Sequence, residues 1–283
     1  MSDGKNKNGG RNGMAFTEVD YTTHDRIAIV TLNRPEQLNA WTAVMGQEVR
    51  AAMELADSDD NVRVIILTGA GRGFCAGADM KRLSQISSAG RLEEAVDAPF
   101  DPSSPRDFQR KNTYFPAVSK PIIAAINGPC AGLGFCFALF CDMRFASQQA
   151  VFTTAFARRG LIAEHGMSWT LPRLVGLSKA TDLLLSARKV AADEALRIGL
   201  IDRLFAGDEL MPATLAYARE LAELSSPRSL RVIKRQLWQS PMQTLDQAMD
   251  VADHEMALSL ASDDFKEGVK HFVEKRAPAF TGR

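Results

Sequence analysis

The sequence predicts an α/β protein, and three observations lead to that prediction. Short apolar runs rich in β-branched residues lie at residues 27–32, 62–68 and 122–126, each bounded by Gly, Pro, Asn or Asp. Between the first two runs, residues 40–55 have apolar side chains at the spacing of an amphipathic helix. Beyond Leu204 the strand-like runs stop, and only helical spacing follows.

This pattern divides the chain into three regions. Residues 1–14 are polar and rich in Gly and Asn without the apolar core of a signal peptide, so we expect a flexible tail and a cytoplasmic protein. Residues 15–205 form the predicted α/β core. Residues 206–283 are predicted to form a helical subdomain, because helical spacing occurs at 211–224, 229–238 and 242–260. Its apolar faces need a partner surface, since isolated helices bury too little area.

Composition argues against several kinds of partner. The 283 residues are 46% hydrophobic and contain 34 Lys plus Arg against 34 Asp plus Glu, so a large core is expected and attraction to nucleic acid is not. No apolar run approaches the roughly 18 residues of a membrane span. The four cysteines lack zinc-ligand spacing, which predicts buried thiols in a reducing compartment and no metal site.

Two glycine-rich segments share one design. Residues 71–83 (GRGFCAGADMKRL) and 127–143 (NGPCAGLGFCFALFCDM) each follow a predicted strand, pass through small residues and enter a helix. Small residues admit a ligand close to the backbone, and the first amides of a helix have no internal acceptor. Two such amides can form an oxyanion hole for a thioester enolate. The alternative is that the small residues of both segments serve only close packing.

A third segment, residues 84–115, contains DAPFDPSSPRD, and its prolines and serines predict a loop that interrupts helical pieces. Long loops over an α/β core often contact substrate, so we expect this loop to do so.

The order and spacing of five motifs resemble the crotonase family, also called the enoyl-CoA hydratase/isomerase family. The resemblance covers about residues 16–283, and the motifs are NRPEQLNA, RGFCAGADMK, KPIIAAINGPCAGLGF, ADEALRIGLIDRL and EGVKHFVEKRAPAF. It implies a spiral of ββα repeats with a C-terminal helical oligomerisation subdomain. It also implies an acyl-CoA substrate and assembly into trimers, often paired as hexamers.

The resemblance assigns the oxyanion donors to the backbone amides of Ala78 and Leu133. Leu133 stands where many relatives have glycine, but only its amide is needed. The neighbouring Ala76, Asp79 and Gly132 are then substrate-binding positions.

Three basic residues are implied to bind the phosphates of coenzyme A. These are Arg34, Lys81 and Lys275, although a merely solvated charge is the alternative for each. In relatives, the C-terminal segment reaches the nucleotide end of a ligand bound by a neighbouring subunit.

Two departures from the family pattern affect the chemistry. Hydratases of the family use two glutamates, whereas Cys136 and Phe156 occupy those positions here. We expect Cys136, Phe156 and Trp169 to be walls of the acyl pocket or core residues, because no base is recognisable near the thiol.

A different acid, Glu164, lies in GLIAEHGMSWTLPRLVG, between a strand-like piece and an amphipathic helix. This segment resembles the one in which enoyl-CoA isomerases carry a single catalytic acid. One carboxylate can move a double bond by removing a proton and returning it two carbons away. The alternative is an acid that stabilises a helix start. His165 is adjacent, but neighbours on a helix point in different directions, so no Glu–His pair is expected.

The sequence therefore predicts an acyl-CoA enzyme that stabilises an enolate, with Glu164 as acid and base. Isomerisation or hydration of an enoyl-CoA in fatty-acid or related metabolism is expected. Coenzyme A enters as part of the substrate, and no metal or redox cofactor is implied. The alternatives are dehalogenation with an acid of this segment as nucleophile, hydrolysis, or a catalytically silent acyl-CoA binding protein that has lost both glutamates.

Overall fold

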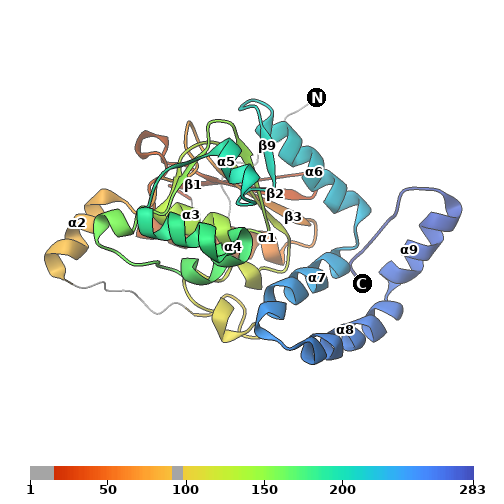
Figure 1. The fold of residues 1–283 in the computed structure, drawn as a ribbon. Helices are drawn as coiled ribbons and strands as arrows, with labels where there is room; N and C mark the ends of the chain where they lie inside the picture. The colour runs from red at the N-terminus through yellow and green to blue at the C-terminus, as the bar shows by residue number, and fades with distance from the viewer. Residues whose placement is uncertain (1–15, 91–97) are drawn as a thin grey trace, which may run out of the picture.

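The computed structural model describes residues 16–90 and 98–283, and the predicted tail lies outside them. Strands and helices alternate through the first two thirds of the chain, and helices alone form the last part (Figure 1). The predicted α/β class is confirmed. Within these residues, no helix is long and apolar enough to cross a membrane.

The larger sheet has six strands in the order β1-β2-β3-β4-β6-β9, antiparallel between β1 and β2 and parallel elsewhere. Its strands are β1 (Val19–His24), β2 (Ile27–Leu32), β3 (Val64–Gly69), β4 (Ile122–Ile126), β6 (Met143–Ser147) and β9 (Arg203–Phe205).

Both faces of this sheet are covered. Ile65 and Leu67 join the core that includes helix α1 (Ala43–Ser58), whereas Val64 and Ile66 join the one that includes α6 (Leu210–Leu224). A parallel strand buried on both faces needs apolar residues without alternation, which explains the unbroken apolar runs.

A second sheet has three short strands in the order β5-β7-β8, namely β5 (Cys130–Ala131), β7 (Val151–Thr153) and β8 (Val190–Ala191). Helix α3 (Gly132–Phe140) follows β5 directly, and all its residues except Leu133 are buried. A helix that is apolar on every side belongs in the core. Leu133 is thus the point at which α3 meets the surface.

Three further helices are α2 (Met80–Ala89), α4 (Met167–Ser186), which contacts α3, and α5 (Ala192–Arg197), which contacts β7 and β8. α4 is interrupted at Gly176, whose φ of 76° is left-handed. The predicted loop 84–115 begins within α2, contains the 3-10 turn Arg106–Phe108 and ends where the 3-10 turn Phe115–Ala117 begins, while its residues 91–97 lie outside the described residues.

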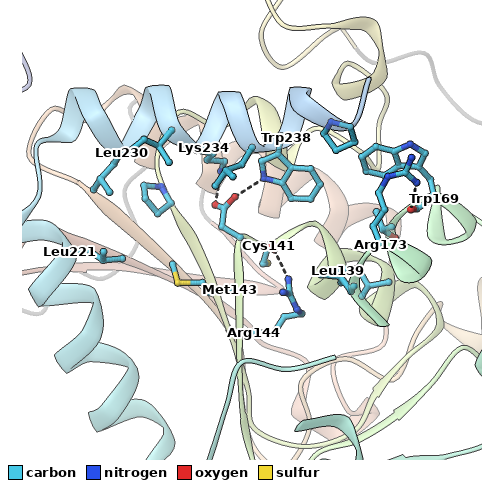
Figure 2. Close-up of a pocket in the computed structure, with 17 residues that line it drawn as sticks. Leu139, Cys141, Met143, Arg144, Trp169, Arg173, Leu221, Leu230, Lys234 and Trp238 are labelled. Atoms are coloured by element: carbon cyan, nitrogen blue, oxygen red, sulfur yellow. Dashed lines mark hydrogen bonds and ion pairs between the residues drawn. The ribbon is translucent and has the colours of Figure 1, made fainter. Parts of the chain in front are cut away.

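The C-terminal helices are α7 (Pro227–Gln239), α8 (Leu245–Leu260) and α9 (Asp263–Glu274), and the last two extend away from the sheets (Figure 1). α7 is tied to the core by the Asp142 carboxylate, which lies 2.9 Å from Lys234 Nζ and accepts a 2.7 Å hydrogen bond from Trp238 Nε1 (Figure 2). α8 and α9 leave large apolar side chains such as Leu245 and Phe272 exposed.

Candidate active site

The two glycine-rich segments lie side by side at one end of the sheets. A parallel bridge pairs Cys75 with Cys130. The carbonyl of Pro129 accepts hydrogen bonds from the amides of Phe74 (3.1 Å) and Cys75 (3.0 Å), and the Cys75 carbonyl accepts one from Ala131 (2.9 Å). The ends of the two segments, where α2 and α3 begin, are therefore held together.

Glycine is required where these segments touch. A Cβ on Gly134 would lie 2.5 Å from the Cβ of Cys75, which is closer than real Cβ atoms approach. Gly77 has a left-handed φ of 98°, and a Cβ there would lie 3.1 Å from the Ala131 carbonyl oxygen. Close packing thus explains these two glycines, as the structural alternative proposed, but it also brings two helix starts to one place.

Ala78 and Leu133 line the same cavity. Leu133 is the second residue of α3, so its amide has no acceptor within the helix. In the described part of the chain, neither amide donates a hydrogen bond to another protein group. Both residues thus combine a backbone amide without a protein acceptor in that part of the chain with a place in the cavity wall.

This cavity has a volume of about 270 Å³ and mainly apolar walls. Five of the predicted site residues line it, namely Ala78, Gly132, Leu133, Phe156 and Glu164. The remaining lining residues are Trp41, Thr42, Ala43, Gly46, Leu83, Lys111, Asn112, Arg159, Leu161 and His165.

Glu164 lies in an irregular loop, contrary to two sequence expectations. Residues 160–163 do not form a strand, and α4 begins only at Met167, with no acidic residue in its first turn. The backbones of His165 and Gly166 are left-handed, with φ of 50° and 72°, so the chain is not α-helical at these two residues. Glu164 therefore lies two residues before Gly166, which caps the start of α4, and not in the first turn of that helix. The Glu164 side chain is 35% exposed and lines the cavity.

His165 approaches Glu164, although the sequence predicted that the two would point apart. Its Nε2 lies 3.6 Å from a carboxylate oxygen of Glu164, and its Nδ1 lies 3.0 Å from Nδ2 of Asn112. The expectation assumed that Glu164 and His165 are neighbours on a helix. The left-handed backbone of His165 shows that they are not, so their side chains can approach each other.

Cys136 is buried behind the cavity and does not line it. Its Sγ lies 3.8 Å from the backbone carbonyl oxygen of Glu164. Burial, reinforced by the negative charge of Glu164, raises the pKa of the thiol well above its ordinary value. The thiol stays neutral, and its contact with Glu164 is through the backbone.

Trp169 lines a different space, a cavity of about 390 Å³ beneath α7 (Figure 2). The Arg173 guanidinium lies 4.0 Å from the centre of the Trp169 ring, and Trp238 lies across the cavity. The structure therefore does not bring Trp169 into the cavity that contains Glu164. Its sequence position on a helix could not tell which cavity it faces.

The predicted phosphate-binding residues lie outside the cavity. The Arg34 guanidinium lies between the carboxylates of Glu18 (3.3 Å) and Asp79 (3.0 Å), so its charge is matched within the fold. Lys81 is exposed beside Asp79, which accepts a 2.9 Å hydrogen bond from the Lys81 amide. Lys275 ends α9 and is exposed on the C-terminal helices.

Ala76 also lies outside the cavity lining, and its amide donates to the Leu38 carbonyl at 2.9 Å. Sequence reasoning missed Trp41, whose amide and carbonyl bond the backbone of Gly77 and Asp79 and so hold Ala78 in place. Its position directly after the NRPEQLNA motif was the available signal. Asn112 comes from the loop predicted to contact substrate.

Comparison with known proteins places this arrangement in a family. A family model described as enoyl-CoA hydratase/isomerase matches residues 22–283. The chain is 36% identical over 258 residues to the probable enoyl-CoA hydratase EchA12 of Mycobacterium tuberculosis H37Rv, covering 90% of this chain and 89% of that protein. It is 34% identical to 1,2-epoxyphenylacetyl-CoA isomerase of Escherichia coli K12, covering 91% and 95% of the two chains.

A solved enoyl-CoA hydratase of Mycobacterium tuberculosis H37Rv is similar in structure, with a TM-score of 0.83 and 29% identity over 94% of this chain and 99% of the other. The protein belongs to the enoyl-CoA hydratase/isomerase family. It is an enzyme of that family, of the lyase or isomerase type, and it has the crotonase fold that the sequence predicted.

Proposed function

We propose that the protein moves the double bond of an enoyl-CoA, with Glu164 as the single acid and base. The observation that supports this most strongly is the composition of the cavity. Glu164 is the one carboxylate among the described residues that line it. The two positions at which family hydratases carry glutamates hold Cys136, a buried neutral thiol, and Phe156, an apolar wall.

The proposed reaction starts from a 3-enoyl-CoA. The Glu164 carboxylate takes a proton from the carbon between the double bond and the thioester, and the electron pair passes into the thioester carbonyl. The protonated Glu164 then returns the proton two carbons away, which yields the 2-enoyl-CoA. The proposed reaction consumes no water and uses no metal or redox cofactor, and coenzyme A is part of the substrate.

The amides of Ala78 and Leu133 are proposed to hold the enolate oxygen. Among the described residues neither amide has a protein acceptor, and Ala78 and Leu133 both line the cavity that contains Glu164. A donor aimed at a developing oxyanion contributes about 10² to 10³ in rate, so two of them can make a thioester α-proton accessible to a carboxylate.

Hydration by a single carboxylate is the second candidate, because several relatives are named enoyl-CoA hydratases. It would use Glu164 to activate water without the second glutamate. The predicted trimer or hexamer, the cytoplasmic location and the binding of coenzyme A phosphates by basic residues remain predictions.

Product identification separates these reactions. The protein is incubated with matched 2-enoyl-CoA and 3-enoyl-CoA, and the products are separated by chromatography and weighed. Isomerisation gives a product of unchanged mass and new retention. A product heavier by one water indicates hydration, and acyl-CoA binding without turnover of either substrate indicates a silent binding protein.

A further inference from the structure

The loop that carries Glu164 holds a second titratable group with a defined orientation. His165 is a non-glycine residue with φ of 50°, a backbone conformation that such residues seldom adopt. Gly166 continues the left-handed turn. This turn places the imidazole in the same cavity as Glu164, with 23% of the side chain exposed.

The contact with Asn112 selects the tautomer of the imidazole. Nδ2 of Asn112 lies 3.0 Å from Nδ1 of His165, and an amide nitrogen can only donate a hydrogen bond. Nδ1 therefore accepts, and the proton of the neutral ring resides on Nε2. Nε2 is the nitrogen that faces the Glu164 carboxylate, at 3.6 Å.

We infer that His165 is a positioning residue for Glu164, held by Asn112 in the tautomer that donates from Nε2 to one carboxylate oxygen. This leaves the other oxygen to meet the substrate carbon. The inference rests on the proposed function, since it assigns an orientation to the proposed base.

The separation of 3.6 Å is longer than a hydrogen bond. Catalytic hydrogen bonds in ligand-free enzymes are often long and tighten when substrate binds. Glu164 has three rotatable bonds and no regular secondary structure around it. A carboxylate on such a loop benefits from a fixed donor, because a displacement of about 1 Å from the reactive geometry can reduce turnover by about 10². Lys111 and Arg159 also line the cavity and contribute positive charge there.

Two substitutions separate orientation from loop structure. His165→Asn keeps the left-handed backbone, which Asn tolerates well, but its side chain is too short to reach Glu164. His165→Gln can present an amide N–H near the position of Nε2. We expect the Asn variant to lose roughly 10-fold to 10²-fold in kcat with little change in KM, and the Gln variant to recover most of the loss.

Equal kcat for the wild type and the Asn variant, in an enzyme that Glu164→Gln inactivates, would overturn the inference. Equal losses in the Asn and Gln variants would also overturn it, because they would indicate a structural role for the ring. Full activity of Glu164→Gln would instead refute the proposed function, so the two failures are distinguishable.

The tautomer of His165 can be determined by NMR spectroscopy without measuring turnover. In protein labelled with 15N-histidine, the His165 signals are assigned by their loss in His165→Gln. We expect an unprotonated Nδ1 and a protonated Nε2 at neutral pH, and a changed tautomer ratio in Asn112→Ala. A ring protonated on Nδ1, alone or on both nitrogens, would contradict the assignment whatever the reaction is.

Discussion

Gly134 lies against Cys75 so closely that an added Cβ would be 2.5 Å from the Cβ of the cysteine. Glycine inside a helix is otherwise unfavourable compared with alanine. The contact therefore accounts for a glycine in α3, and it fixes the distance between the two segments that carry the amides of Ala78 and Leu133.

Gly134→Ala is expected to push these segments apart. Overpacking of this kind costs about 1 to 3 kcal/mol, so the melting temperature and the turnover should both fall. Gly268→Ala in α9 is the matched control, because a Cβ there meets Phe280 at an ordinary 3.8 Å. The control should be neutral or slightly more stable. Calorimetry that finds the same melting temperature for both variants would contradict this account of Gly134.

Cys136→Ala is expected to leave most of the activity intact. The thiol is buried, neutral and outside the cavity lining, so it has no proton-transfer role in the proposed reaction. Steady-state kinetics on the proposed substrate provide the measurement. A loss beyond about 10², the scale of a removed acid or base, would show that Cys136 takes part in the chemistry.

Lys234→Met is expected to loosen α7 from the core. It leaves the partly buried Asp142 without its ion-pair partner, and breaking a buried pair from one side costs about 3 to 5 kcal/mol. The remaining bonds from Trp238 and the Ile122 amide place the cost at the lower end. Lys266→Met breaks the exposed pair with Asp263 and should change the denaturation midpoint little. Equal midpoints for the two variants would refute this role for Lys234.

The C-terminal helices are expected to mediate assembly. α8 and α9 expose large apolar side chains, among them Leu245, Phe272 and Val273, which a monomer would leave in contact with water. Light scattering at micromolar concentration should give the mass of a trimer or a hexamer. A uniform monomer would count against the prediction.

The sequence predicted the parts of the fold that depend on local pattern. The run at residues 122–126 coincides with β4, and the three C-terminal helical stretches coincide with α6, α7 and α8 to within three residues. The resemblance to the family also predicted that Ala78, Leu133 and Glu164 share one site, and all three line one cavity in the structure. The strands and helices are encoded in periodicity, whereas these three site residues were implied by the resemblance to the family.

Features set by backbone dihedral angles and by tertiary contacts were not predictable in this way. The left-handed φ of His165 was not predictable, since only a few per cent of non-glycine residues adopt it, and the expected helix gave the wrong orientation relative to Glu164. Trp169 faces the cavity beneath α7 because of how α4 packs, which helical spacing alone does not specify.

The role of Glu164 is tested most directly by Glu164→Gln, which keeps the size and polarity of the side chain but removes the base. We measure turnover of a 3-enoyl-CoA together with the affinity for a saturated acyl-CoA, and check the melting temperature. The account predicts that turnover falls by about 10² to 10⁴ while affinity and melting temperature change little. Full turnover by the Gln variant would contradict it.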